Sequence, residues 1–107
     1  MGKRKPSVRS ERRARSRAHE HLVHDLEQLA RSAPGGSPER PVDVEAPTQV
    51  EQIAQTTACP LCEGGLHVED HAAETHSGVR LRVARVRCLH CGVARALYFR
   101  LAQAMPH

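Results

Sequence analysis

Apolar side chains recur at helical spacing in the first third of the chain. They stand three or four residues apart and so share one helix face: Ala18, Leu22, Leu26, Leu29 and Ala30. Ser10 is a suitable N-cap, and neither proline nor glycine interrupts the residues that follow it up to Ser32. The pattern predicts a helix over residues 10–32 that is amphipathic from its middle onward.

The segments on either side of this helix lack such periodicity. Residues 1–9 are basic and show no repeating apolar pattern, which predicts a disordered arm. Residues 33–56 are acidic and rich in Pro and Gly, which predicts a linker. Within it, "TQVE" at residues 48–51 fits a capping box, so a short helix is expected over residues 49–56.

Apolar and polar positions alternate in the second half of the chain, as is typical of half-buried strands. Three such stretches stand at residues 66–68, 79–83 and 97–101. The sequence "HAAETHSG" between the first two predicts a turn that closes on Gly78. The alternation changes parity at Ala84, which predicts a β-bulge near that residue.

Four cysteines frame these strands. They form two Cys-x-x-Cys pairs, namely Cys59 with Cys62 and Cys88 with Cys91. A tight Cys-x-x-Cys turn places two thiolates on one side of a zinc ion, about 2.3 Å from it, and a second turn completes the tetrahedron. The sequence therefore predicts one structural Zn²⁺ ion. The small residues after each pair, Gly64, Gly65 and Gly92, relax the backbone where the chain turns away from the metal.

Other uses of paired cysteines fit this chain less well. A thioredoxin-type centre needs a helix after its first cysteine, whereas both pairs here lead toward strands. Iron also accepts four thiolates, but rubredoxin-like carriers resemble acidic, aromatic-rich proteins, and this chain is basic with 2% aromatic residues. The N-terminus does not resemble a secretory signal, which favours a reducing compartment over disulfides. Four cysteine ligands also leave no open position for catalysis.

Composition limits the size of the folded part. The chain has 107 residues with a single Tyr and a single Phe, so its core is small and needs a metal staple. The expected fold is a small metal-stabilised α+β protein, a three-stranded antiparallel zinc ribbon preceded by an amphipathic helix and a basic disordered arm. The predicted parts are the arm at 1–9, the helix at 10–32, the linker at 33–56, the ribbon at 57–103 and a tail at 104–107.

Positive charge gathers at both ends of the chain. Residues 1–17 carry eight basic side chains and one acidic one. Residues 32–78 carry one basic side chain and eight acidic ones, and residues 79–107 carry six arginines and no acid. A polyanion can meet both cationic ends at once. The side chains predicted to contact nucleic acid are Lys3, Arg4, Lys5, Arg9, Arg12, Arg13, Arg80, Arg82 and Arg95.

The cysteine module resembles known zinc ribbons. The segments "TTACPLC" and "RCLHCG" look like the ribbons of transcription factors, RNA polymerase subunits and ribosomal proteins. The start "MGKRK" ahead of "TACPLC" is similar to the small transcription-elongation zinc ribbon of the Elf family. This resemblance implies that Cys59, Cys62, Cys88 and Cys91 bind zinc and that the basic arm meets DNA or polymerase.

The sequence thus predicts a non-enzymatic accessory protein that binds nucleic acid or a transcription or ribosome-associated machine, in the cytoplasm, nucleoid or nucleus. No nucleophile–base pair and no apolar run of membrane-spanning length is visible in the sequence. The alternative is a protein–protein adaptor. In that case Leu22, Leu26 and Leu29 dock on a partner or a second copy, and zinc is purely structural.

Overall fold

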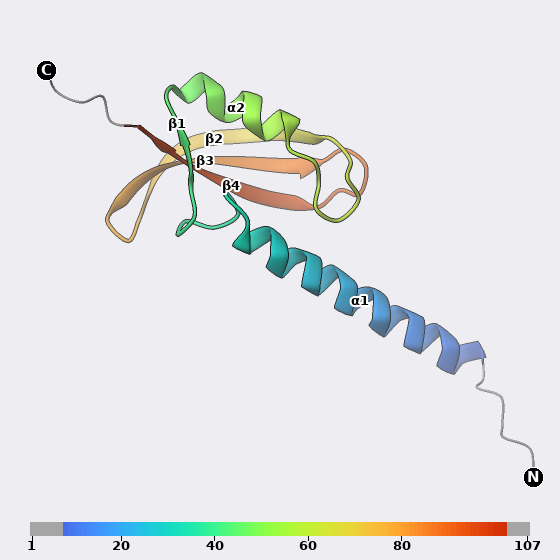
Figure 1. Ribbon diagram of the computed structural model, residues 1–107. Coiled ribbons are helices and arrows are strands. Elements are labelled where there is room, and N and C mark those ends of the chain that lie inside the picture. Colours follow the sequence, from blue (N-terminus) through green and yellow to red (C-terminus); the bar gives the residue numbers. More distant parts are fainter. Residues whose placement is uncertain (1–7, 103–107) are drawn as a thin grey trace, which may run out of the picture.

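The computed structural model describes residues 8–102, which form two helices and one mixed four-stranded sheet (Figure 1). The elements are α1 (Val8–Ser32), β1 (Val42–Val44), α2 (Pro47–Thr56), β2 (Leu66–His76), β3 (Val79–Cys88) and β4 (Ala94–Leu101). The strand order is β1-β4-β3-β2, with β2, β3 and β4 antiparallel and β1 parallel to β4. The expected α+β class is confirmed. The predicted tail at residues 104–107 lies outside the described residues.

The sheet has one strand more than the three that the sequence predicts. β1 lies in the segment expected to be a linker and pairs along its whole length with β4. Val44 is only 3% exposed, and the Tyr98 N–H donates a hydrogen bond to the Gly35 carbonyl at 2.8 Å. This segment therefore packs on the sheet instead of separating two parts. A strand of three residues is too short for its alternation to stand out from a loop.

α1 extends away from the sheet, joined to it at its C-terminal end (Figure 1). The described part of the chain is 83 Å long and has a radius of gyration of 19.3 Å, against about 13 Å for a compact domain of about 100 residues. No residue of α1 is buried. It begins two residues before the predicted start, so Arg9 belongs to the helix and not to the arm, whose residues 1–7 lie outside the description. Neither helix in the described range is long and apolar enough to cross a membrane.

The core lies between α2 and one face of the sheet. Val50 and Ala54 of α2 are fully buried and belong to one apolar cluster with Ala84, Val86 and Phe99. This contact fixes α2 over β2, β3 and β4, next to the turn that carries the first cysteine pair. Burial of these few side chains is the main apolar contribution to the fold.

α2 begins before the predicted capping box. Its N-cap is Ala46 rather than Thr48, and Pro47 occupies the first helical position. Proline suits this position because its fixed φ is helical and it has no N–H left to satisfy. The Gln49 side-chain oxygen accepts hydrogen bonds from the N–H groups of Ala46 at 3.2 Å and Glu45 at 2.6 Å, which completes the helix start.

β3 is a central strand with buried side chains on both faces. Ala84 and Val86 belong to the cluster under α2, whereas Leu81 and Val83 point to the opposite face and are also 1% exposed or less. The parity change in the sequence therefore marks a strand whose two halves bury opposite faces. A strand that is covered on both faces does not show strict alternation of apolar and polar positions.

A bulge is present near Ala84, as predicted, but it belongs to the partner strand β2 and not to β3. β3 pairs without interruption with β4 through Ala84. The register shift lies instead in β2, between Val68 and Asp70, which leaves Glu69 as the extra residue.

The turn between β2 and β3 is much shorter than the predicted "HAAETHSG" loop. β2 continues to His76, which pairs with Val79, so only Ser77 and Gly78 connect the strands. Both connecting residues have positive φ, 50° and 78°, as a type I′ hairpin turn requires. Residues 71–76 belong to β2, but their small and polar side chains lack the apolar alternation by which a strand is recognised in the sequence.

Candidate metal centre

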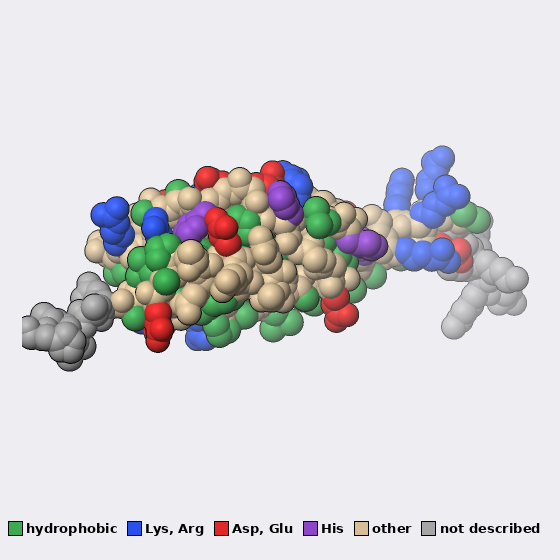
Figure 2. All heavy atoms as spheres, turned by 90° about the horizontal axis from the view of Figure 1, so that it is seen from above, with side chains coloured by type: hydrophobic (Ala, Val, Ile, Leu, Met, Phe, Trp, Pro, Cys, Tyr) green, Lys and Arg blue, Asp and Glu red, His purple; other side chains and the backbone are tan. Residues whose placement is uncertain are grey.

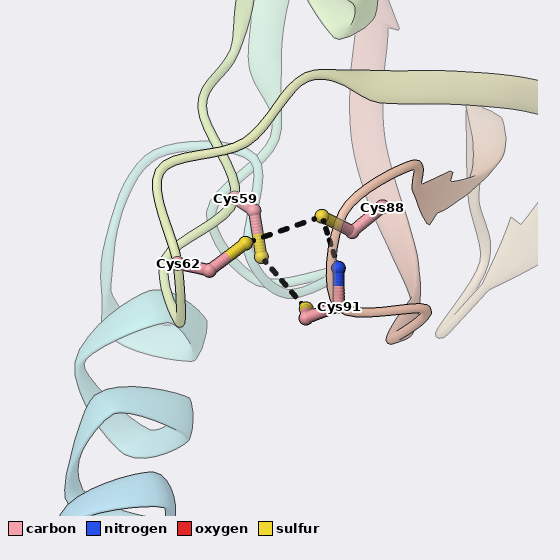
Figure 3. Close-up of side chains that lie close together, drawn as sticks. All are labelled: Cys59, Cys62, Cys88 and Cys91. Carbon is pink, nitrogen blue, oxygen red and sulfur yellow. Dashed lines mark hydrogen bonds between the residues drawn. The ribbon is translucent and has the colours of Figure 1, made fainter.

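The four cysteines meet at one end of the sheet (Figure 3). Cys59 and Cys62 come from the turn between α2 and β2, Cys88 ends β3, and Cys91 lies in the turn before β4. Their Sγ atoms all lie within 4.8 Å of one another. All four are free thiols. The fold thus brings the two predicted pairs face to face, and the cluster can hold a metal ion.

The two cysteine turns repeat the same backbone geometry. The Cys59 carbonyl accepts a hydrogen bond from the Glu63 N–H at 2.8 Å, and the Cys88 carbonyl accepts one from the Gly92 N–H at 3.1 Å. Glu63 and Gly92, each directly after its pair, have positive φ of 63° and 80°. Glycine adopts this conformation without strain, so Gly92 fulfils the predicted role. In the first turn a glutamate takes the position instead.

The sulfur spacing fits a tetrahedral ion. Four thiolates about 2.3 Å from a central metal lie about 3.8 Å from one another. Cys59 Sγ lies 3.7 Å from Cys91 Sγ, and Cys62 Sγ lies 3.3 Å from Cys88 Sγ. Cys59 and Cys88 are buried while Cys91 is exposed, so the cluster has one side in the core and one at the surface.

Backbone N–H groups prepare the sulfurs for negative charge. Those of Cys91 at 3.4 Å and His90 at 3.3 Å point at Cys88 Sγ and lower the pKa of this thiol to about 6. The Gly64 N–H acts to lower the pKa of Cys62, but the hydrogen bond shared with Cys88, together with burial, raises it to about 12. Cys62 is therefore harder to ionise than its neighbour Cys88. A divalent cation bound to four thiolates would displace the remaining thiol protons.

Gly64 is required by close packing and not by its backbone angles. A Cβ atom at this position would lie 2.8 Å from the His90 Cβ and 3.2 Å from the Sγ atoms of both Cys62 and Cys88. At Gly65 an added Cβ would meet nothing within 4 Å. Gly64 thus packs directly against the cysteine cluster, whereas Gly65 leaves space for a larger side chain.

The predicted nucleic-acid residues fall in separate places. Lys3, Arg4 and Lys5 lie outside the described residues, and Arg9, Arg12 and Arg13 lie on the exposed first half of α1. Arg80 and Arg82 share one face of β3, near the hairpin and at the end of the strand away from Cys88.

Arg95, the remaining residue of the predicted nucleic-acid set, does not lie beside Arg80 and Arg82. It pairs with Val86 in the register, and its side chain is only 9% exposed. Its guanidinium donates a hydrogen bond to the Glu27 carboxylate of α1 at 2.9 Å. Arg95 therefore ties α1 to the sheet. The pair is 68 residues apart in sequence, and no local pattern announces it.

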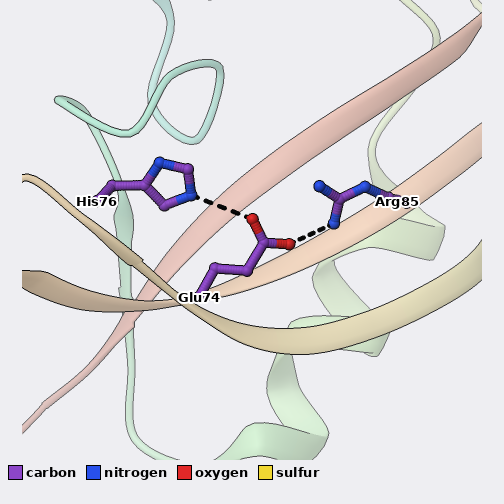
Figure 4. A network of polar contacts seen from close by, with 3 residues as sticks. All are labelled: Glu74, His76 and Arg85. Carbon is purple, nitrogen blue, oxygen red and sulfur yellow. Dashed lines mark hydrogen bonds and ion pairs between the residues drawn. The ribbon is translucent and has the colours of Figure 1, made fainter.

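A second polar cluster also escapes the sequence pattern (Figure 4). Glu74 accepts hydrogen bonds from Arg85 and from His76, and the His76 ring packs edge-on against Tyr98 with centroids 5.5 Å apart. These side chains share the face of Val83 and cover it. The Arg85 guanidinium holds the pKa of Glu74 below its usual value of 4.5. The cluster is a polar cover over the second buried face of β3.

The structure thus belongs to a small mixed α+β protein with four cysteine thiols at one end of its sheet, close enough together to hold a metal ion. No protein-family model matches the chain, and no curated protein or solved structure is significantly similar to it.

Proposed function

We propose that this chain is a non-enzymatic zinc-ribbon accessory protein that binds nucleic acid or a nucleic-acid-bearing machine. One Zn²⁺ ion held by Cys59, Cys62, Cys88 and Cys91 stabilises the domain, and the basic helix supplies the main binding surface. Zinc is favoured by the donor set and by the size of the cluster, since four thiolates at tetrahedral spacing suit this ion.

The role of the zinc is structural. Four cysteine ligands close the coordination shell and leave no position for a reacting water. The apolar core under α2 is small, and the two cysteine turns lie at its edge with Cys59 and Cys88 buried in it. Structural zinc contributes on the order of 10 kcal/mol to modules of this kind, which is enough to decide whether they fold.

The observation that carries the binding proposal is the state of the arginines on α1. Figure 2 shows blue side chains gathered at the end of the helix farthest from the sheet. All of them are exposed, and none forms an ion pair with another residue between 8 and 102: Arg9, Arg12, Arg13, Arg15 and Arg17. A projecting helix with unneutralised guanidinium groups suits a phosphate backbone, which attracts such groups irrespective of base sequence.

Affinity for nucleic acid tests this proposal. We expect the zinc-loaded protein to bind short DNA and RNA with an affinity that falls steeply as salt rises. Replacing the five α1 arginines by glutamine should abolish most of this binding while keeping the helix, because glutamine is a good helix former. If the protein bound neither DNA nor RNA at low salt, this result would contradict the proposal.

A protein adaptor is the second candidate, favoured by one observation on the same helix. Leu22 and Leu29 are 56% and 67% exposed, which is unusual for two leucines on one face. A Leu22→Gln/Leu29→Gln double variant separates the two functions. It should leave nucleic-acid affinity unchanged if the arginines bind, and it should abolish capture of a partner or self-association if the leucines do.

A further inference from the structure

The sheet opens at the end opposite the cysteines. The last pair between β3 and β4 is Arg82 with Phe99, and beyond it β4 continues beside β1, where the Ala102 N–H donates to the Val44 carbonyl at 2.7 Å. β3 runs on into its hairpin with β2. The space between the diverging strands is a hollow of about 340 Å³, lined by Ala73, Arg80, Leu81, Arg82 and Leu101.

The two arginines of this hollow differ from the others in β3 and β4. Four arginines of these strands are held by carboxylates, in the pairs Arg85–Glu74, Arg87–Glu69, Arg95–Glu27 and Arg100–Asp43. Arg80 and Arg82 form no hydrogen bond or ion pair with any residue of the described chain. The hollow therefore carries two positive charges that no carboxylate within residues 8–102 neutralises.

The positions of these two arginines suit a single anion. They stand two residues apart on β3 and point to the same face, about 6.6 Å apart along the strand. Two long guanidinium side chains at this spacing can converge on one phosphate, and each can donate two hydrogen bonds to it. Leu101 lies on the same face of the sheet as the two arginines and reduces access of water there, which strengthens charge-assisted hydrogen bonds.

We propose that this hollow, the Arg80/Arg82 notch, binds a backbone phosphate of a nucleic-acid strand. The inference rests on the proposed function and adds a second contact to it. Cys88 lies six residues beyond Arg82 along β3, about 20 Å away, so the notch is separate from the metal centre. The arginines of α1 lie at the far end of the molecule, and a strand that reaches both surfaces must run along the body of the protein (Figure 1).

Salt-dependent binding of a single-stranded oligonucleotide tests the notch. We compare the zinc-loaded full chain with Arg80→Gln/Arg82→Gln and with the control Arg87→Gln/Arg100→Gln, which removes the same charge from arginines already paired with acids. Loss of two phosphate contacts should reduce the slope of log K against log salt by about 1.4, since each contact on a single strand contributes about 0.7. The control should keep the native slope. Equal slopes in the two variants would overturn the proposal.

Inorganic phosphate separates the notch from the wider function. In an NMR titration of the zinc-loaded protein at constant ionic strength, phosphate should shift the side-chain N–H signals of Arg80 and Arg82 in a saturable way and leave those of Arg87 and Arg100 unchanged. If these signals do not move, and the notch variant binds the oligonucleotide like the control, the proposed phosphate site is wrong, while the proposal that α1 binds nucleic acid is unaffected. If they saturate but no oligonucleotide binds, the notch takes free phosphate and the nucleic-acid function falls.

Discussion

Replacing Gly64 by alanine perturbs the metal centre without removing a ligand. The new Cβ would lie 2.8 Å from the His90 Cβ and 3.2 Å from the sulfurs of Cys62 and Cys88. Non-bonded atoms prefer about 3.5–4.0 Å, so these groups must separate by several tenths of an ångström. The two sulfurs belong to the proposed zinc tetrahedron and cannot move apart freely.

The expected effect on zinc affinity follows from the cost of overpacking. Such insertions cost about 1–3 kcal/mol in a close-packed site. If this cost falls on the metal-bound state, the dissociation constant for zinc rises about 5-fold to 150-fold. A competition titration against a chelator of known affinity measures the change.

Gly65→Ala is the matched control, because its added Cβ meets nothing within 4 Å. It should bind zinc within about twofold of the native protein, since a substitution without contacts changes free energy by about 0.5 kcal/mol or less. Native zinc affinity in Gly64→Ala, or an equal loss in both variants, would refute the packing argument.

Three further outcomes are expected. Removing the metal with a chelator, or Cys62→Ser, should unfold the sheet while α1 keeps part of its circular dichroism signal. Glu74→Gln should lower the free energy of unfolding equally at pH 7.5 and pH 5.5. The Arg85 ion pair lowers the pKa of Glu74 in the folded protein below 4.5. The ion pair therefore stabilises the fold fully above the unfolded-state pKa, and this stabilisation is lost only as pH falls through the folded-state pKa. Urea unfolding measures the loss of stability in the variant, and a loss that is smaller at pH 5.5 than at pH 7.5 contradicts this reasoning. Glu27→Gln should release α1 from the sheet and shorten its rotational correlation time in NMR relaxation, and Glu20→Gln should not.

The sequence predicts the metal cluster well because its signal is local. Each Cys-x-x-Cys pair forms one turn, and two turns at the ends of a hairpin meet when the strands pair. The leucine face of α1 is likewise visible as a period, although the structure leaves Leu22 and Leu29 exposed. Features that depend on a few neighbouring residues can be predicted without knowledge of the tertiary structure.

The errors fall where distant contacts decide the outcome. β1 forms because it pairs with the edge of β4, and a sequence of three residues contains no signal for that pairing. The parity change at Ala84 has two explanations, a bulge or a strand covered on both faces, and only the covering elements distinguish them. The burial of His71 likewise has no local signal: its side chain is 13% exposed, and its Nδ1 atom lies 3.6 Å from a carboxylate oxygen of Glu51 in α2. Each of these features depends on where α2 and the linker pack.

The metal content of the protein tests the central claim most directly. Native mass spectrometry of the full chain, purified without added metal, reports both the identity and the number of bound ions. The account predicts one zinc ion per chain, lost when any one of Cys59, Cys62, Cys88 and Cys91 is replaced by serine. A folded chain without metal, or one that holds iron, would contradict the proposal of a structural zinc ribbon.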